Sequence, residues 1–503
     1  MVLGDTMKNS SPKHFFILLA LICLVGAGLR LVRLSNRSYT SDESYELSNL
    51  STDVFAIARD ADGFPPTFRW LLSGYIEAFG TIHARLPSVC FGILTVFTIG
   101  LAGRAIGGDF IGLGGAVVSA LSAHQIDFSQ QCRAYAFSIL CVTVAMLACI
   151  QVFQTWKWSA WVMFIFGCWF ALGSHYYAGF FIMEAWLFLL WTTASRPINR
   201  GFIGAAIFFV MALVWVVCLR VDLSEPIPIE WYNPLDLTGL AYTYFSLAVG
   251  WCVGPSSIRL QEVSKLEGIV QIVPWAAIAL GCSSILAYRG FGRLQKPFAA
   301  WLVLVLTLTP LVAGSVAVAM HSTFTGRYLA WLAVPFSLLI GAGMSWRGFS
   351  VSTLATYLLL GVNLLSTYNR LFDPEYDREN YKELVAYLEH REESPVILSL
   401  SLYLGNAVKN EINSNTRFGA IALGSEEDRD SNSTLMRLVN GLGDEKVVFL
   451  VTDWLNEGNL LVSSRDEWLQ ELKATRVTRI SNTIDVFVTT ARECRGRALL
   501  NSQ

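Results

Sequence analysis

Charged side chains are scarce in this sequence. Of its 503 residues only 15% are Asp, Glu, Lys or Arg, and the formal net charge is −2. Soluble proteins usually carry about 25% of charged residues, so this scarcity argues against a soluble chain. There is also no tract rich in Lys and Arg, and we therefore expect no nucleic-acid partner.

Cysteine-based sites are missing as well. Ten cysteines are spread over the chain without a CxxC pair or a His/Cys cluster, which argues against a zinc site or a redox motif. Apolar residues are abundant instead and make up 53% of the sequence. This balance favours a protein of the lipid bilayer.

Apolar stretches of nearly twenty residues recur along most of the chain. Because a helix of about 20 residues crosses the hydrocarbon core, they predict about eleven transmembrane spans. The expected spans are 15–34, 84–103, 110–126, 135–154, 159–175, 177–194, 202–220, 269–288, 297–319, 328–345 and 350–367. No small-residue cleavage site follows the first span, so we interpret it as an uncleaved helix rather than a signal peptide.

Basic residues fall on alternate sides of these spans. The expected inner turns contain Arg104, Lys157, the stretch "SRPINR" and the stretch "YRGFGRLQK". Inner loops of membrane proteins carry an excess of Lys and Arg, which predicts a cytoplasmic N-terminus. An odd number of spans then places the C-terminus on the outer side of the cell membrane.

The composition changes abruptly after about residue 370, where charged residues become frequent. Helical patterns such as "ENYKELVAYLEHRE" alternate there with strand patterns such as "PVILSLS" and "KVVFLV". This alternation predicts a small α/β domain. We therefore expect a transmembrane domain over 1–370, with an outer loop at 35–83, and an extracytoplasmic α/β domain over 371–503. The C-terminal part lacks GxGxxG and P-loop signatures, so nucleotide binding has no support.

An acidic stretch, "RSYTSDESYELS", follows the first span at residues 37–48. It has a structural interpretation, because Thr40 and Glu43 have the spacing of a capping box and Asp42 would lie in the first helical turn. It also has a chemical interpretation. The outer loop is far longer than a connection between two helices requires, and it contains a second acidic motif, "DADGFPPTF", with Asp62. Two acidic segments in one outer loop predict a polar cavity at the membrane surface.

Three arginines lie at predicted outer ends of spans, namely Arg85, Arg133 and Arg327. Tyr135, His175 and Tyr328 are close to them in the sequence or at the same predicted level. Each arginine has a structural interpretation as an interfacial anchor. Guanidinium groups also bind phosphate with two parallel hydrogen bonds, so converging arginines would mark a phosphate site.

The order of these motifs resembles the GT-C glycosyltransferases. The relevant stretches are the Asp-Glu pair after the first span, the Pro-Pro motif, "ARLPSVCFGILTV", "SQQCRAYAFSIL" and "GRYLAWLAVPF". The likeness covers about residues 10–345 and is greatest to the group of protein O-mannosyltransferases and aminoarabinose (lipid A) transferases, particularly bacterial members. It implies a polytopic α-helical fold in the inner membrane.

The resemblance also implies an activity. Enzymes of this family move a hexose or pentose from a polyprenyl-phosphate carrier to a protein, lipid or glycan acceptor on the non-cytoplasmic face, with inversion. By motif position Asp42 corresponds to the general base, with Glu43 beside it, and Arg133 and Arg327 to residues that hold the lipid phosphate. Arg85, Tyr135, His175 and Tyr328 are expected to line the same substrate site.

The Pro-Pro motif departs from the family. Asp62 corresponds to an acid of this motif in many members, but Phe64 stands where relatives often have His or Lys. This departure weakens the case for a divalent metal in the loop, and the cofactor stays undetermined.

Two other classes of protein stay open. A secondary transporter would also have about a dozen spans, but it usually shows two similar halves and charged residues within the membrane. A non-catalytic membrane scaffold would leave the Asp-Glu pair and the arginines unexplained.

Overall fold

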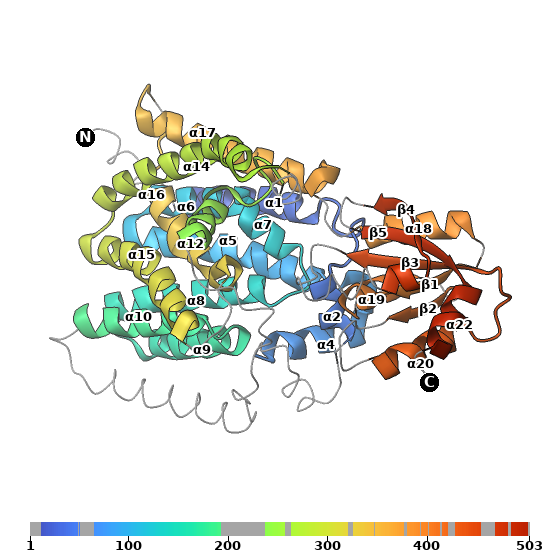
Figure 1. Ribbon diagram of the computed structural model, residues 1–503. Helices are drawn as coiled ribbons and strands as arrows, with labels where there is room; N and C mark the ends of the chain where they lie inside the picture. The colour runs from blue at the N-terminus through green and yellow to red at the C-terminus, as the bar shows by residue number, and fades with distance from the viewer. Residues whose placement is uncertain are drawn as a thin grey trace. The chain divides into compact units, whose positions relative to one another are not determined.

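The chain divides into two units in the computed structural model, and each is described by itself (Figure 1). The helical unit comprises Met1–Leu34, Leu50–Pro255 and Val263–Leu371, and the α/β unit comprises Ser35–Asn49, Ser256–Glu262 and Phe372–Gln503. The structure describes residues 12–48, 50, 65–192, 237–256, 263–319, 325–346, 348–376, 380–392, 394–400, 402–412, 415–420, 428–453, 468–480 and 484–500.

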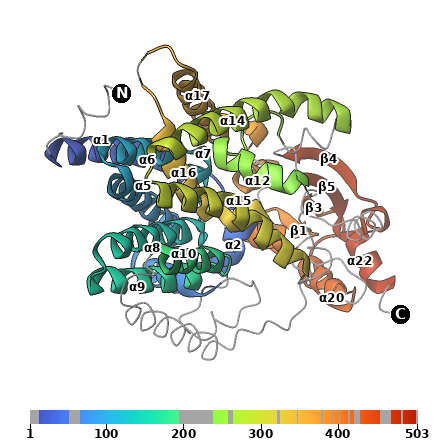
Figure 2. The ribbon, with the colours of Figure 1, turned by 90° about the vertical axis from the view of Figure 1, so that its left-hand side faces the viewer.

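Helices of the first unit follow the apolar runs of the sequence. The longer ones are α1 (Pro12–Leu31), α5 (Leu86–Gly107), α8 (Tyr135–Thr155), α14 (Lys265–Arg293), α15 (Lys296–Ala319), α16 (Ala333–Gly343) preceded by the 3₁₀ helix η3 (Gly326–Leu332), and α17 (Val351–Phe372). Shorter ones are α4 (Thr67–Phe79), η1 (Thr81–His83), α6 (Asp109–Leu121), α7 (Ala123–Ser129), α9 (Trp158–Ser174), α10 (Ala178–Thr192) and α12 (Leu237–Val249). α8, α9 and α10 lie side by side in both views (Figures 1 and 2).

The structure confirms a polytopic helical membrane protein. In the described part of the chain, seven helical stretches are long and apolar enough to cross a membrane. Large apolar side chains such as Leu21 and Leu24 of α1 are more than half exposed, as expected where a helix faces lipid.

Several predicted span boundaries differ from the structure. The predicted span 110–126 is interrupted, because the backbone of Ser122 is extended and its side chain caps α7 by accepting from the backbone N–H of Gln125. The predicted outer loop 221–268 contains the apolar helix α12, whose 13 residues are too few for the twenty-residue pattern that we sought. The predicted span 202–220 lies outside the described residues.

Glycines allow α6 and α16 to pack closely. A Cβ atom added to Gly341 of α16 would lie 2.2 Å from the backbone nitrogen of Gly115, and one added to Gly114 would lie 2.5 Å from the Gly341 carbonyl oxygen. No side chain fits at such distances. Small residues at helix contacts are typical of membrane proteins, because packing replaces the hydrophobic effect there.

Pro310 interrupts the hydrogen bonding of α15, and a residue of another helix compensates for it. Proline has no N–H, so the carbonyl of Leu306 four residues earlier loses its partner within the helix. The hydroxyl of Tyr244 on α12 donates to that carbonyl oxygen at 2.6 Å. α12 is therefore fastened to α15 where the helix is weakest.

We expect Tyr244→Phe to lower the unfolding free energy of the detergent-solubilised protein by about 1–3 kcal/mol, because it leaves a buried carbonyl without a donor. Thermal unfolding would measure the change. Tyr242→Phe on the same helix is the control, because the Tyr242 side chain is exposed. Equal effects of the two substitutions would contradict the assignment.

The α/β unit contains a five-stranded mixed sheet with the order β2-β1-β3-β5-β4. Its strands are β1 (Val396–Ser399), β2 (Arg417–Ala420), β3 (Val447–Asp453), β4 (Thr475–Ile480) and β5 (Ile484–Thr490). The first three strands are parallel and the last two antiparallel to their neighbours. The helices are α2 (Ser41–Ser48), η4 (Pro374–Tyr376), α18 (Tyr381–Arg391), α19 (Leu402–Lys409), α20 (Asp428–Val439) and α22 (Ala491–Leu500).

Alternating side chains of the strands form two apolar layers. On one face of the sheet, Val396 and Leu398 of β1 pack with residues of α20 and α22. On the other face, Ile397 packs with residues of α18 and α19. Side chains along a strand point to opposite faces in turn, so one apolar run can serve both layers. The predicted α/β composition is confirmed, whereas β4 and α22 were not anticipated.

Candidate functional site

The acidic stretch forms the helix α2, and its capping box is confirmed. The backbone N–H of Thr40 donates to Oε2 of Glu43 at 2.9 Å, and the backbone N–H of Glu43 donates to Oγ1 of Thr40 at 3.2 Å. Glu43 is fully buried. Its carboxylate therefore fixes the start of the helix, as the structural interpretation predicts.

Asp42 differs from its neighbour. It lies in the first turn of α2, takes no part in the capping box and is only partly buried. The two adjacent acids therefore differ in environment. Glu43 is buried and bonded to the backbone of Thr40, whereas the carboxylate of Asp42 is more accessible to solvent. Asp62, the acid of the second motif, lies outside the described residues.

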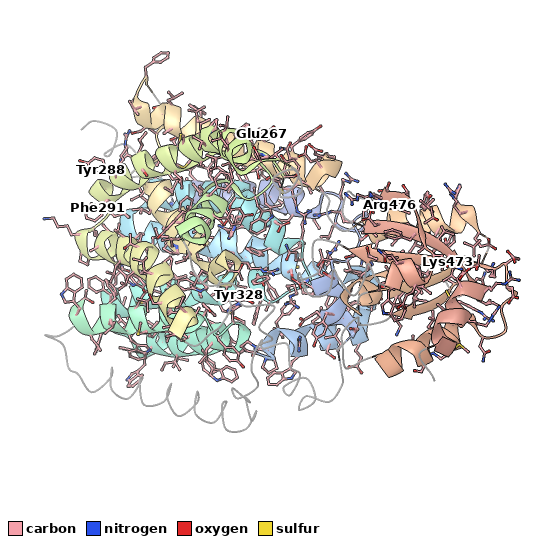
Figure 3. All side chains as sticks on the ribbon, in the orientation of Figure 1. Glu267, Tyr288, Phe291, Tyr328, Lys473 and Arg476 are labelled. Carbon is pink, nitrogen blue, oxygen red and sulfur yellow. The ribbon has the colours of Figure 1, made fainter. Side chains whose placement is uncertain are left out.

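In the helical unit, four rings from distant parts of the sequence meet in one aromatic cluster, defined as Tyr135, His175, Tyr177 and Tyr328. The ring centroid of His175 lies 6.0 Å from that of Tyr135 and 5.4 Å from that of Tyr328. Tyr177 lies 5.8 Å from His175 and 5.3 Å from Tyr328. Figure 3 labels Tyr328 among the side chains of this unit. Three predicted substrate residues are therefore brought together, and Tyr177 adds a fourth that the prediction missed.

Arg133 belongs to the same neighbourhood. It precedes α8 in the chain and is 5% exposed. Its positive charge lies close enough to His175 to act on that ring. Nδ1 of His175 accepts from the backbone N–H of Tyr177 at 3.3 Å, and the ring proton therefore resides on Nε2. The cationic group of Arg133 therefore lies near the neutral imidazole of His175.

Arg85 binds the chain just after the end of α1. Its guanidinium donates to the carbonyl oxygen of Leu34 at 3.1 Å, just beyond α1. The thiol of Cys132 donates to the carbonyl of Ala84 at 3.4 Å. The start of α5 and the turn that carries Arg133 therefore lie side by side, and Arg85 has a structural contact in addition to its predicted role.

Arg327 is placed by η3. It stands one residue before Tyr328, its side chain is exposed, and η3 packs against α8. Tyr328 thus reaches the cluster from a helix almost two hundred residues after Arg133, and Arg327 precedes it in the sequence. The convergence of the two guanidinium groups on one phosphate stays a prediction.

A buried polar segment next to this cluster was missed by the prediction. All residues of α7 are buried, and Asp127 forms an ion pair with Arg370 of α17 at 2.5 Å. The ring of His124 packs edge-on against Phe128, and Phe128 lies 4.7 Å from Tyr135. The run of polar residues in "HQIDFSQQ" was the available signal, but its first three residues were included in the predicted span 110–126 and the rest was given no role.

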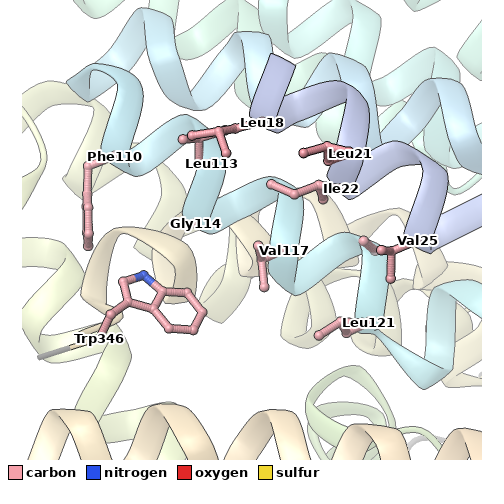
Figure 4. A pocket seen from close by; sticks show the side chains of 11 residues that line it. Leu18, Leu21, Ile22, Val25, Phe110, Leu113, Gly114, Val117, Leu121 and Trp346 are labelled. Carbon is pink, nitrogen blue, oxygen red and sulfur yellow. The ribbon is translucent and has the colours of Figure 1, made fainter. Parts of the chain in front are cut away.

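The structure also has an apolar groove on the helical unit, separate from these residues (Figure 4). Its volume is about 400 Å³. It is formed by α1 and α6 together with Trp346, and no predicted site residue lines it. Its lining is aliphatic and aromatic, so the groove has no group that could perform acid–base chemistry.

Comparisons with known proteins give similarities of structure. No family model matches the chain. No curated protein matches it either. It is similar to ArnT from Cupriavidus metallidurans bound to undecaprenyl phosphate, with 11% identity, coverage of 95% of this chain and 98% of that chain, and a TM-score of 0.49. The archaeal oligosaccharyltransferase AglB from Archaeoglobus fulgidus, in complex with an inhibitory peptide and a dolichol-phosphate, is 10% identical over 87% of this chain and 69% of that chain, with a TM-score of 0.47. The arabinofuranosyltransferase AftD from Mycobacteria is 12% identical over 95% of this chain and 41% of that chain, with a TM-score of 0.48.

Proposed function

We propose that this protein is a membrane glycosyltransferase that moves a sugar from a polyprenyl-phosphate carrier to an acceptor on the non-cytoplasmic face, with inversion. The observation that carries the proposal is the aromatic cluster beside Arg133. Three separate stretches of sequence, each singled out for its motif, supply Tyr135, His175 and Tyr328 to it. Chance interfacial anchors would have no reason to converge.

The reaction is a single displacement. The acceptor hydroxyl oxygen bonds to the anomeric carbon of the sugar, and the bond from that carbon to the phosphate oxygen breaks on the opposite face. The carrier leaves as its phosphate, and the acceptor proton passes to a carboxylate. Attack from the side opposite the leaving group inverts the anomeric centre.

We assign the base role to Asp42 and the phosphate-binding role to Arg133 and Arg327. A positioned carboxylate accelerates such a proton transfer by about 10²–10⁴-fold. A preorganised guanidinium neutralises the charge that develops on the departing phosphate. Arg133 is suited to this because it is buried and beside a neutral histidine, where its charge acts strongly.

Asp62, the acid of the loop for which a divalent metal was considered, lies outside the described residues, so the cofactor stays undetermined. The described residues contain no group of three or more His, Cys, Asp or Glu side chains placed to hold a metal ion. The positive charge that the leaving group requires is available from the arginines.

The direct test uses purified protein and a set of radiolabelled polyprenyl-phosphate sugars in lipid vesicles. One of them should lose its label to an acceptor fraction and yield unlabelled carrier phosphate. Transport of the intact carrier across the vesicle without cleavage would support a transporter and end the proposal.

The basic end of α14 supports one orientation in the membrane. Arg289 and Arg293 lie in its last turns, and the exposed rings of Tyr288 and Phe291 lie close by (Figure 3). Aromatic rings are typical of both membrane interfaces, and an excess of Lys and Arg is typical of the cytoplasmic one. We therefore place this end and the N-terminus in the cytoplasm and the α/β unit outside.

Reporter fusions test this topology. A fusion after residue 290 should report the cytoplasm, and a fusion at the C-terminus should report the opposite compartment, because positive charge keeps the α14–α15 turn inside. Alkaline phosphatase and green fluorescent protein are a suitable pair of reporters. The same compartment for both positions would overturn the orientation.

A further inference from the structure

The segment that carries the acidic helix belongs to the α/β unit, although it follows α1 in the sequence. Residues 35–49 are assigned to that unit together with 372–503, and α2 packs against α19. α2 has only eight residues. An isolated helix of this length is unstable in water, so tertiary contacts must hold it.

Three hydrogen bonds join this segment to Lys382 at the start of α18. The hydroxyl of Ser38 accepts from the backbone N–H of Lys382 at 2.9 Å. This N–H is one of the first in α18 and has no partner within the helix, so Ser38 completes the capping of that helix. The ammonium of Lys382 donates to the carbonyl oxygen of Ser35 at 2.9 Å and approaches that of Arg37 at 3.5 Å.

These contacts lie directly before the acidic helix. Ser38 is buried, and the capping box begins at Thr40 only two residues later. Rigid contacts therefore run from α18 through Ser38 to Thr40 and Glu43, and Asp42 lies within the turn that they define. Little freedom is left to the backbone at Asp42.

We propose that the α/β unit is the positioning element of the transferase, and that Ser38 and Lys382 are positioning residues that hold α2 so that Asp42 has a fixed place. The catalytic part of this inference rests on the proposed function, whereas the anchoring part does not. The α/β unit thereby acquires a role in the reaction that requires no substrate contact of its own.

The test compares two double variants of the full-length protein. Ser38→Ala/Lys382→Met removes the contacts to the acidic segment. Asn380→Ala/Lys446→Met is the matched control. Asn380 also caps α18, by accepting from the N–H of Glu383, and Lys446 pairs with Glu392, so the control removes similar bonds from the same unit without touching residues 35–49.

Two measurements are made on each variant. Hydrogen exchange of the backbone amides of α2 should be about tenfold faster in Ser38→Ala/Lys382→Met than in the control, because the lost hydrogen bonds favour local opening. The kcat for transfer should fall about tenfold with the KM for the donor unchanged, because a misplaced base slows chemistry without weakening phosphate binding. Ser38→Thr/Lys382→Arg keeps a hydroxyl and a cation and should restore both values.

Unchanged exchange of α2 would overturn the anchoring, whatever the activity. Faster exchange with a normal kcat would overturn the positioning role. A parallel assay of Asp42→Asn tests the base role of Asp42 separately from the anchoring of residues 35–49. Normal transfer by that variant refutes Asp42 as the base, while the exchange result still decides whether α18 anchors the segment.

Discussion

Asp42→Asn is expected to reduce sugar transfer by about 10²–10⁴-fold with the fold intact, because the change removes the proton acceptor and preserves the shape of the side chain. Its structural cost should be small. Asp42 lies in the first turn of α2 outside the capping box, and the loss of its favourable interaction with the helix dipole costs about 0.3–1 kcal/mol. Initial rates with labelled donor and thermal unfolding measure the two effects.

Glu43→Gln is the matched control for this experiment. Glutamine serves in a capping box nearly as well as glutamate, so this variant should keep both the helix and most of the transfer activity. The opposite pattern, with loss of transfer in Glu43→Gln and normal transfer in Asp42→Asn, would assign the base to Glu43. Normal transfer by both variants would leave the acidic stretch with a purely structural role.

Arg133→Met is expected to lower kcat/KM for the polyprenyl-phosphate donor by about 10²–10³-fold, the usual cost of losing one preorganised group that stabilises developing negative charge. Arg133→Lys should lie between this variant and the wild type, because it keeps the charge but loses the planar fork that binds phosphate with two bonds. Steady-state kinetics over a range of donor concentrations measure both.

Arg289→Met supplies the comparison for Arg133. Arg289 is an arginine of α14 on the helix end that we place in the cytoplasm, and its loss should leave kcat/KM close to the wild-type value. Binding of a carrier phosphate without sugar should weaken in the Arg133 variants only. If Arg289→Met and Arg133→Met have the same effect, the arginines act through general charge and not through a site.

Part of the aromatic cluster could be predicted from the sequence. "SQQCRAY", "SHYYAG" and "GRYLAW" were each recognisable, because a polar or basic residue at the end of a long apolar run is a local feature. The sequence did not show that the ring of His175 would lie near those of both Tyr135 and Tyr328, since this depends on the packing of α8, α9 and η3.

α12 and α7 show where the local rules were insufficient. α12 is a 13-residue apolar helix within a stretch expected to be an outer loop, and the search was tuned to lengths that cross a bilayer. α7 is polar and yet wholly buried, because its groups find partners such as Arg370 on a helix far away in the sequence. Neither hydropathy nor periodicity within a short window contains that information.

A multi-span helical protein with a C-terminal α/β region could be predicted from the sequence, because apolar length and side-chain periodicity act within a few turns of helix or one strand. The capping box of Thr40 and Glu43 could be predicted as well, because its partners are three residues apart. The packing of α2 with α19 and the capping of α18 by Ser38 became visible only in the folded protein. Those contacts join residues more than three hundred positions apart. Their formation depends on the folding of the whole α/β unit, which no local pattern encodes.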